Sequence, residues 1–122
     1  MSAGQRIVLH EVGPRDGLQV EKTVVPTETK LRWISALCEA GLDVVQVGSF
    51  VHPEKVPQMA DTDALFRALT APGAERKGHA LYSGLVLNEK GLDRALACGV
   101  EMVCLGVSAS ETHSRKNTGM GT

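Results

Sequence analysis

Hydrophobic positions follow two spacings that alternate along the chain. Short, nearly continuous apolar runs rich in β-branched residues predict four strands, at 7–11, 44–47, 79–86 and 102–107. Between these runs, apolar residues recur every three or four positions, which predicts three helices, beginning near Pro26, Asp61 and Asn88. The expected order of elements is therefore βαβαβαβ, followed by a polar tail at 108–122.

Each predicted helix has one apolar face, which we expect to pack on the strands. These faces comprise Leu31, Ile34, Leu37 and Cys38 in the first helix, Ala64, Leu65, Ala68 and Leu69 in the second, and Leu92, Ala95 and Leu96 in the third. Small polar residues at the helix starts predict N-caps at Thr27, Asp61 and Asn88. Gly41 is the expected C′ residue of the first helix.

Two eight-residue segments resemble each other. Residues 41–48 and 99–106 both read Gly, apolar, acid, apolar, Val, variable, apolar, Gly. Such a repeated helix–strand junction is typical of parallel α/β folds, so the chain is either the N-terminal half of a (β/α)₈ TIM barrel or a small open sheet. The first strand is not followed by Gly-x-Gly-x-x-Gly, which argues against a dinucleotide-binding fold.

Composition narrows the function without identifying it. The chain has 122 residues, 43% of them hydrophobic and 22% charged, with a net charge of −1 and 3% aromatic residues. This balance favours neither nucleic acid nor a membrane surface as a partner. The sequence has no run of 18 apolar residues and no signal-peptide pattern, and its three cysteines are widely spaced. These features predict a cytoplasmic protein with free thiols.

The most informative segment is 11–19, Glu-Val-Gly-Pro-Arg-Asp-Gly-Leu-Gln, at the carboxyl end of the first strand. Parallel α/β folds place their active sites at this end of the sheet. The Asp16 carboxylate could bind a hard cation such as Mg²⁺ or Mn²⁺. The Arg15 guanidinium could hold a substrate carboxylate or stabilise an enolate. From these residues alone, an ordinary surface loop with an Arg–Asp pair remains the alternative.

Four sequence blocks, in order and over most of the chain, resemble the hydroxymethylglutaryl-CoA lyase family. They are 12–19 with 21–22, 48–53 with 56–59, 88–91, and 108–111 with 116–117. The resemblance implies a TIM barrel that cleaves 3-hydroxy-3-methylglutaryl-CoA to acetyl-CoA and acetoacetate by a retro-aldol reaction with a divalent cation. It also implies that Asp16 is a metal ligand, that Arg15 stabilises the enolate, and that Gln19 and Asn117 line the pocket for the acyl-CoA.

The sequence departs from the family pattern at the end of the second strand. Gln46 stands where the family usually carries a functionally important glutamate. Glutamine keeps the shape and an acceptor oxygen but loses the negative charge. We therefore assign Gln46 to the catalytic set and leave open another 3-hydroxyacyl-CoA or oxo-acid as the substrate, including that of a Claisen-type synthase.

The family's later parts have no counterpart in these 122 residues. The sequence has no His-x-His pair, and the three cysteines fall on predicted helices and strands, where we expect them to serve as packing residues. The chain therefore resembles an incomplete barrel domain over 1–122, expected to be inactive alone and to form a homo-oligomer. A truncated, non-catalytic binding protein is the alternative.

The histidines, four basic residues and Trp33 are assigned no part in the chemical step. The four histidines, His10, His52, His79 and His113, are expected to be ordinary structural or solvated residues. Basic residues that could meet the CoA phosphates are Lys22, Lys55, Arg115 and Lys116. Trp33 lies off the apolar stripe of the first helix, where it could contact a partner surface.

Overall fold

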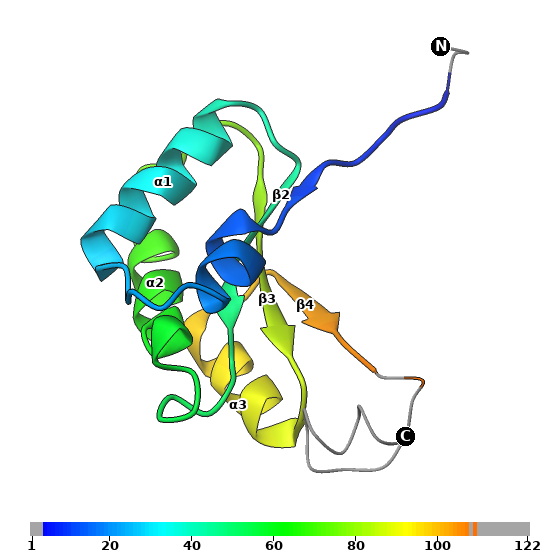
Figure 1. Cartoon of the computed structure of the whole chain (residues 1–122). Helices are drawn as coiled ribbons and strands as arrows, with labels where there is room; N and C mark the ends of the chain where they lie inside the picture. The colour runs from blue at the N-terminus through cyan, green and yellow to red at the C-terminus, as the bar shows by residue number, and fades with distance from the viewer. Residues whose placement is uncertain (1–3, 108, 110–122) are drawn as a thin grey trace.

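The computed structural model describes residues 4–107 and 109, and its elements follow the expected order. The main elements are β1 (His10–Glu11), α1 (Thr27–Glu39), β2 (Val44–Ser49), α2 (Thr62–Leu69), β3 (Leu81–Val86), α3 (Glu89–Cys98) and β4 (Met102–Leu105). A π-helical turn, η1 (Gly13–Gly17), follows β1, and a 3₁₀ turn, η2 (Pro57–Met59), precedes α2. The prediction of βαβαβαβ is confirmed (Figure 1).

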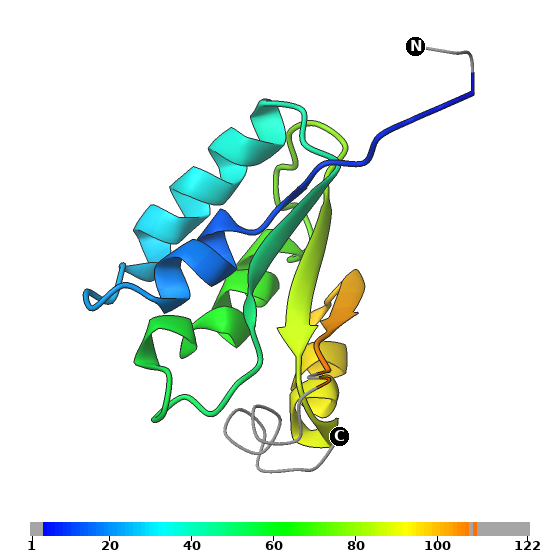
Figure 2. The ribbon, with the colours of Figure 1, turned by 45° about the vertical axis from the view of Figure 1, so that its right-hand side comes forward.

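All four strands are parallel and lie in the order β1-β2-β3-β4. The three helices pack on one face of this sheet, as the two ribbon views show (Figures 1 and 2). The shared core contains Ile34 and Cys38 from α1, Phe66 from α2 and Ala95 from α3, together with Val45 of β2. Because every strand runs in the same direction, all their carboxyl ends lie at one edge of the sheet.

A β-bulge in β2 determines which side chains lie on the face of the sheet opposite the helices, called the open face below. Gln46 pairs with Ser83, but two residues later Gly48 pairs with Gly84 and Ser49 with Leu85, so the register shifts at Val47. Ser83 and Leu85 are two apart and share a face. The bulge therefore brings both Gln46 and Ser49 to the face opposite the helices.

The helix faces differ from the expected stripes. Ala64 and Ala68 are exposed, and Leu92 and Leu96 are 37% and 68% exposed. The buried residues of α3 are Gly91, Ala95 and Cys98, small side chains that allow a close approach to the sheet. Because α3 lies next to β4, which is an edge strand, no described element covers the outer side of α3.

The three predicted helix caps have different outcomes. Asn88 is confirmed, since its side chain accepts a 2.9 Å hydrogen bond from the Gly91 amide. Thr27 was wrong as an N-cap: it is the first helical residue, and its hydroxyl donates to Asp61. Asp61 precedes α2 as expected, but its carboxylate binds α1 instead of capping α2. Gly41 follows α1 with a φ of +93°, as expected for C′.

Three of the strands are shorter than expected, most of all the first, whereas β2 runs two residues beyond the predicted 44–47 and ends at Ser49. Ile7, Val8 and Leu9 lie outside β1 and are 56–73% exposed, because this edge strand has only β2 beside it. The third strand begins at Leu81 instead of His79, and the fourth ends at Leu105. No helix in the part of the chain that the structure describes is long and apolar enough to cross a membrane.

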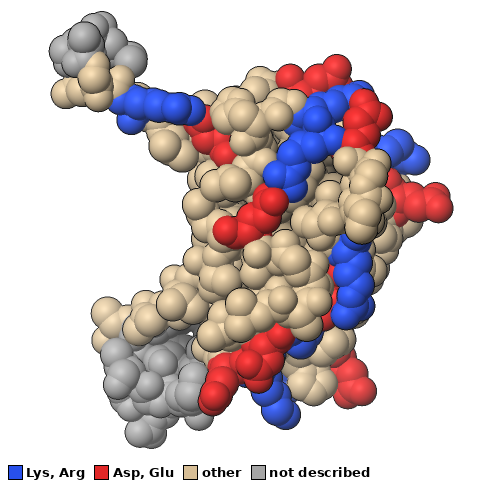
Figure 3. Space-filling model, turned by 180° about the vertical axis from the view of Figure 1, so that it is seen from behind, with Lys and Arg blue, Asp and Glu red and all other residues tan. Residues whose placement is uncertain are grey.

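Acidic and basic side chains are mixed over the surface. Viewed from behind, red and blue groups lie close to one another along the upper, right-hand and lower margins, with tan surface between them (Figure 3). This distribution agrees with the near-zero net charge of the sequence.

Candidate active site

The site begins with the turn that leaves β1. The Asp16 and Arg15 amides both donate to the Val12 carbonyl, at 2.7 and 3.1 Å, which winds η1 tightly after the strand. The Glu11 carboxylate accepts the Gly13 amide at 2.9 Å and fixes the start of the turn. Pro14 is buried in the turn, so its ring anchors η1 to the body of the protein. As a result, Arg15 and Asp16 are held at the carboxyl edge of the sheet.

Arg15 connects the turn to β2. Its Nε donates to Gln46 Oε1 at 2.6 Å, and its Nη1 donates to Asp16 Oδ1 at 3.3 Å. Gln46 is 3% exposed, and the Arg15 side chain is 19% exposed. Because guanidinium nitrogens only donate, the amide oxygen of Gln46 must face Arg15. The structure thus brings together three residues that the sequence assigned to one site, while their roles remain predictions.

A second pair lies beside the first. The Ser49 hydroxyl, which is fully buried, donates to Gln19 Oε1 at 3.2 Å. Gln19 therefore lies at the same edge as Arg15, where the resemblance placed it. Ser49 was not singled out from the sequence, although the block 48–59 contains it; the bulge that orients it has no clear sequence signal. Asn117 lies outside the described residues.

The open face carries one further polar contact that the sequence did not predict. His10 Nε2 and Ser83 Oγ are 2.7 Å apart, across β2. Ser83 is fully buried and pairs in register with Gln46. The expectation that His10 is a hydrogen-bonded strand residue is therefore confirmed, and it lies on the same face as Gln46.

Asp16 has the chemistry of a metal ligand, but it stands alone. Its side chain is 65% exposed, and an exposed carboxylate of this kind suits hard divalent cations. Among residues 4–107 and 109, no group of three or more His, Cys, Asp or Glu residues could hold a metal ion. The described residues thus offer Asp16 as a candidate ligand for a divalent cation, without a set of three such side chains around it.

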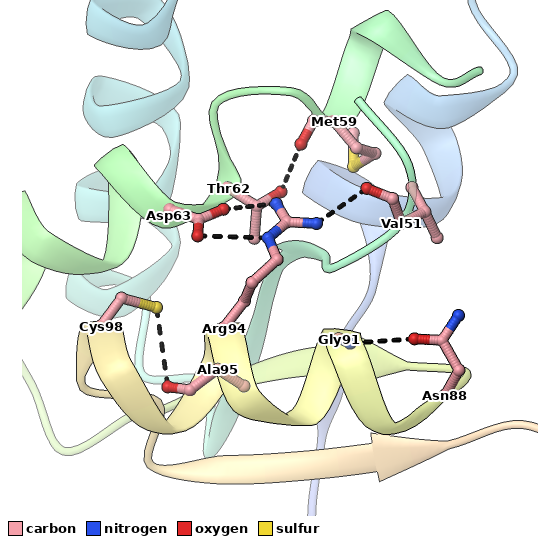
Figure 4. Close-up of polar contacts among 9 residues, drawn as sticks. All are labelled: Val51, Met59, Thr62, Asp63, Asn88, Gly91, Arg94, Ala95 and Cys98. Carbon is pink, nitrogen blue, oxygen red and sulfur yellow. Dashed lines mark hydrogen bonds and ion pairs between the residues drawn. The ribbon is translucent and has the colours of Figure 1, made fainter. Parts of the chain in front are cut away.

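The loop after β2 borders this edge and is held by α3 (Figure 4). Arg94 of α3 donates to the Val51 carbonyl at 2.9 Å and binds both oxygens of Asp63, at 2.5 and 3.3 Å. Its guanidinium also lies 5.5 Å from the centre of the Phe50 ring. A Cβ at Gly91 would lie 2.7 Å from the Phe50 carbonyl, so only glycine allows α3 to pack this close to the loop.

The cysteines behave as packing residues. Cys38 and Cys98 are buried, and burial raises the pKa of both thiols, which keeps them protonated. Cys104 is half-buried in β4. All three thiols are free, as expected.

The other polar residues and Trp33 considered from the sequence lie at separate places in the molecule. His52 and Lys55 are exposed in the loop after β2, and Lys22 is exposed before α1. His79 contacts Asp43 at the opposite, amino edge. Trp33, 47% exposed, lines an apolar groove of about 490 Å³ with Pro14, Leu18, Val25 and Leu37, between η1 and α1. His113, Arg115 and Lys116 lie outside the described residues.

Known proteins similar to this chain include hydroxymethylglutaryl-CoA lyases of bacteria and animals. Hydroxymethylglutaryl-CoA lyase YngG of Bacillus subtilis is 41% identical over 118 residues, covering 97% of this chain and 38% of its own length. The mitochondrial hydroxymethylglutaryl-CoA lyase of Rattus norvegicus is 46% identical over 114 residues, covering 93% of this chain and 33% of its own length. The chain therefore spans between 33% and 38% of the length of these two relatives.

Solved structures extend the similarity to the fold. An HMG-CoA lyase from Acinetobacter baumannii, in complex with coenzyme A and 3-methylmalate, superposes with a TM-score of 0.84 at 38% identity. The superposition covers 93% of this chain and 36% of that one. The four-stranded sheet is thus part of a TIM barrel, as predicted. A family model described as HMGL-like matches residues 6–122. With this match and these relatives, the chain belongs to the HMGL-like family.

Proposed function

We propose that this chain forms the first part of a divalent-metal-dependent carbon–carbon lyase, in an incomplete barrel domain over 1–122. The observation that carries the proposal is the Arg15–Gln46 hydrogen bond beside Asp16, at the carboxyl edge of the sheet, in a chain of the HMGL-like family. The substrate class is an acyl-CoA, and the leading substrate is 3-hydroxy-3-methylglutaryl-CoA.

Retro-aldol cleavage moves electrons from the 3-hydroxyl group toward the thioester carbonyl. The 3-hydroxyl gives its proton to a base, and the C2–C3 bond breaks, which leaves acetoacetate. The electron pair of the broken bond forms the enolate of acetyl-CoA, and protonation at C2 completes acetyl-CoA. Arg15 would donate hydrogen bonds to the enolate oxygen, and its hydrogen bond to Gln46 supports this role by fixing the guanidinium. Gln19, which accepts a hydrogen bond from Ser49, would bind polar groups of the substrate, and we assign Asn117 to the same pocket.

Asp16 would hold the divalent cation, Mg²⁺ or Mn²⁺. When bound, such a cation polarises the hydroxyl and carboxylate oxygens of the substrate as a Lewis acid. Because Mg²⁺ keeps most of its waters when few ligands are offered, Asp16 alone is expected to bind it weakly. The isolated chain is therefore expected to show no turnover.

Gln46 favours a second candidate, a relative with a different acyl-CoA or oxo-acid substrate. Its amide takes the place of a negative charge near the proposed cation, which changes the charge balance that a bound substrate carboxylate would meet. A Claisen-type synthase of the same barrel group is compatible with this change. The substrate preference of the reconstituted site separates the two candidates.

The open strand edges support homo-oligomer formation by the chain. Both β1 and β4 have unpaired outer edges in the described sheet, and such edges associate readily. The free thiols support a cytoplasmic location, although the rat relative is mitochondrial by name.

A hybrid enzyme tests the proposed function. These 122 residues would replace the matched segment of the Bacillus subtilis relative, and acetoacetate release would be measured with Mg²⁺ or Mn²⁺. We expect metal-dependent turnover that Asp16→Asn abolishes, while Asp93→Asn, at an exposed aspartate of α3, leaves it unchanged. A folded hybrid that turns over no acyl-CoA substrate would overturn the proposal.

A further inference from the structure

Lys30 is the single buried charged side chain in the described part of the molecule, at 1% exposure. It lies in the first turns of α1, four residues before Ile34 and eight before Cys38, so it occupies the apolar stripe that faces the core. A buried ammonium costs several kcal/mol in lost hydration unless it is fully hydrogen-bonded. A lysine in this position therefore needs an explanation beyond packing.

The Lys30 ammonium has two partners, both from the segment between β2 and α2. Its Nζ donates to the Gln58 carbonyl at 2.5 Å and to Asp61 Oδ1 at 2.7 Å. The other oxygen of Asp61 accepts from the Thr27 hydroxyl at 2.7 Å, which adds a second link from α1. The buried ion pair thus attaches the loop after β2 to α1.

Gln58 extends this attachment to the loop after β1. Its backbone carbonyl binds Lys30, while its side-chain Nε2 donates to the Glu21 carbonyl at 2.7 Å. Glu21 closes the segment that begins at η1, and its own amide donates to the Leu18 carbonyl. One lysine therefore holds both loops that border the Arg15–Gln46 pair.

We propose that Lys30 is a positioning residue for the candidate active site, joining the loop after β2 to the loop after β1 through Gln58. Its chemistry suits this task, since an ammonium offers three donors on a compact group. Arg94 also holds the loop after β2, through the Val51 carbonyl. Among the described residues, Lys30 and Gln58 link this loop to the loop after β1, and the Ser49–Gln19 hydrogen bond adds a link from the end of β2.

Amide hydrogen exchange on the full chain tests the coupling. Lys30→Met should speed exchange about tenfold or more at Lys55, Val56 and Met59, and also at Arg15, Asp16 and Glu21, whose amides are hydrogen-bonded within the two loops. Gln58→Leu, which keeps the Lys30–Asp61 ion pair, should speed exchange only at Arg15, Asp16 and Glu21. The control is Arg76→Met, which removes a cation at the amino edge and should change neither group.

The hybrid enzyme supplies the functional readout, which rests on the proposed function. We expect both Lys30→Met and Gln58→Leu to lower kcat about tenfold with a smaller change in KM, because Arg15 acts on charge that develops during the reaction. An inactive parent hybrid refutes the proposed function, while hydrogen exchange still judges the coupling. Unchanged exchange at Arg15 and Asp16 in Gln58→Leu overturns the coupling, even if Lys30→Met fails to fold.

Discussion

The two edges of the sheet use the same residue types differently. At the amino edge, Asp43 accepts hydrogen bonds from the Leu9 amide, Arg6 and His79, and Glu101 binds the Tyr82 amide and Arg76. At the carboxyl edge, Arg15 makes two contacts, and Asp16 has a side chain that is 65% exposed. The acids of the amino edge are committed to structure, whereas the carboxyl edge keeps charge accessible to a ligand.

The supports of the two edges also differ. Arg76 lies over the Tyr82 ring at 4.2 Å and is partly exposed, so its ion pair with Glu101 resembles an ordinary surface bridge. The support beneath the carboxyl edge is the buried ammonium of Lys30. Buried charge is costly to leave without a partner, so this edge tolerates fewer changes. Sites that must hold a defined geometry commonly depend on such locked neighbours.

The largest expected effect on stability follows from removing the anion that faces Lys30. Asp61→Asn leaves a buried ammonium without its counter-charge, and we expect it to lower the free energy of unfolding by about 3 kcal/mol. Urea denaturation would measure this loss. The double variant Lys30→Met/Asp61→Asn should recover part of it, since both charges are then absent. A loss below about 0.5 kcal/mol for Asp61→Asn would place this pair with ordinary surface bridges.

Gln46→Glu sharpens the contrast at the proposed site. In the hybrid enzyme, the new carboxylate would replace the neutral amide whose Oε1 lies 2.6 Å from Arg15 Nε. It would therefore lie beside the guanidinium and near the proposed cation. We expect about a tenfold change in kcat/KM or a change of preferred acyl-CoA. Steady-state kinetics with two acyl-CoA substrates would measure both. If rate and preference stay the same, residue 46 does not tune the chemistry.

The smallest effect concerns pH at the amino edge. Hydrogen bonds from the Leu9 amide, His79 and Arg6 lower the pKa of Asp43 from about 3.8 to about 2. A lowered pKa means that the stabilisation is complete above pH 4 and is lost as the pH falls toward 2. Asp43→Asn should therefore be less stable at pH 7 and lose less stability between pH 4 and pH 2. Parallel pH profiles for the two proteins, measured by urea denaturation, would contradict this.

Much of this arrangement could be predicted from the sequence, because it depends on strand direction. Parallel strands place their carboxyl ends together, so Arg15, Asp16 and Gln46 were expected at one edge. The parts that were missed depend on tertiary contacts. Thr27 looks like a cap, but its hydroxyl binds Asp61, 34 residues away. The bulge at Val47, which brings Ser49 to the open face, leaves no clear pattern in the sequence.

The burial of Lys30 is consistent with its spacing in the sequence, but that spacing does not predict it. It shares the helical stripe of Ile34 and Cys38, at spacings of four and eight residues. A lysine beside an apolar stripe normally extends into solvent, so periodicity alone assigns it to the surface. Only the fold reveals Asp61 and the Gln58 carbonyl at the end of its side chain.

The difference between the two edges is tested most directly by removing one arginine from each. In the hybrid enzyme, Arg15→Met should lower kcat by about 100-fold or more with little change in melting temperature, because the role proposed for Arg15 is to stabilise the developing charge. Arg76→Met should lower the melting temperature while kcat stays within about twofold of the parent, a change too small to reflect a lost transition-state contact. Loss of kcat in both variants, or in neither, would contradict the assignment of catalysis to the carboxyl edge.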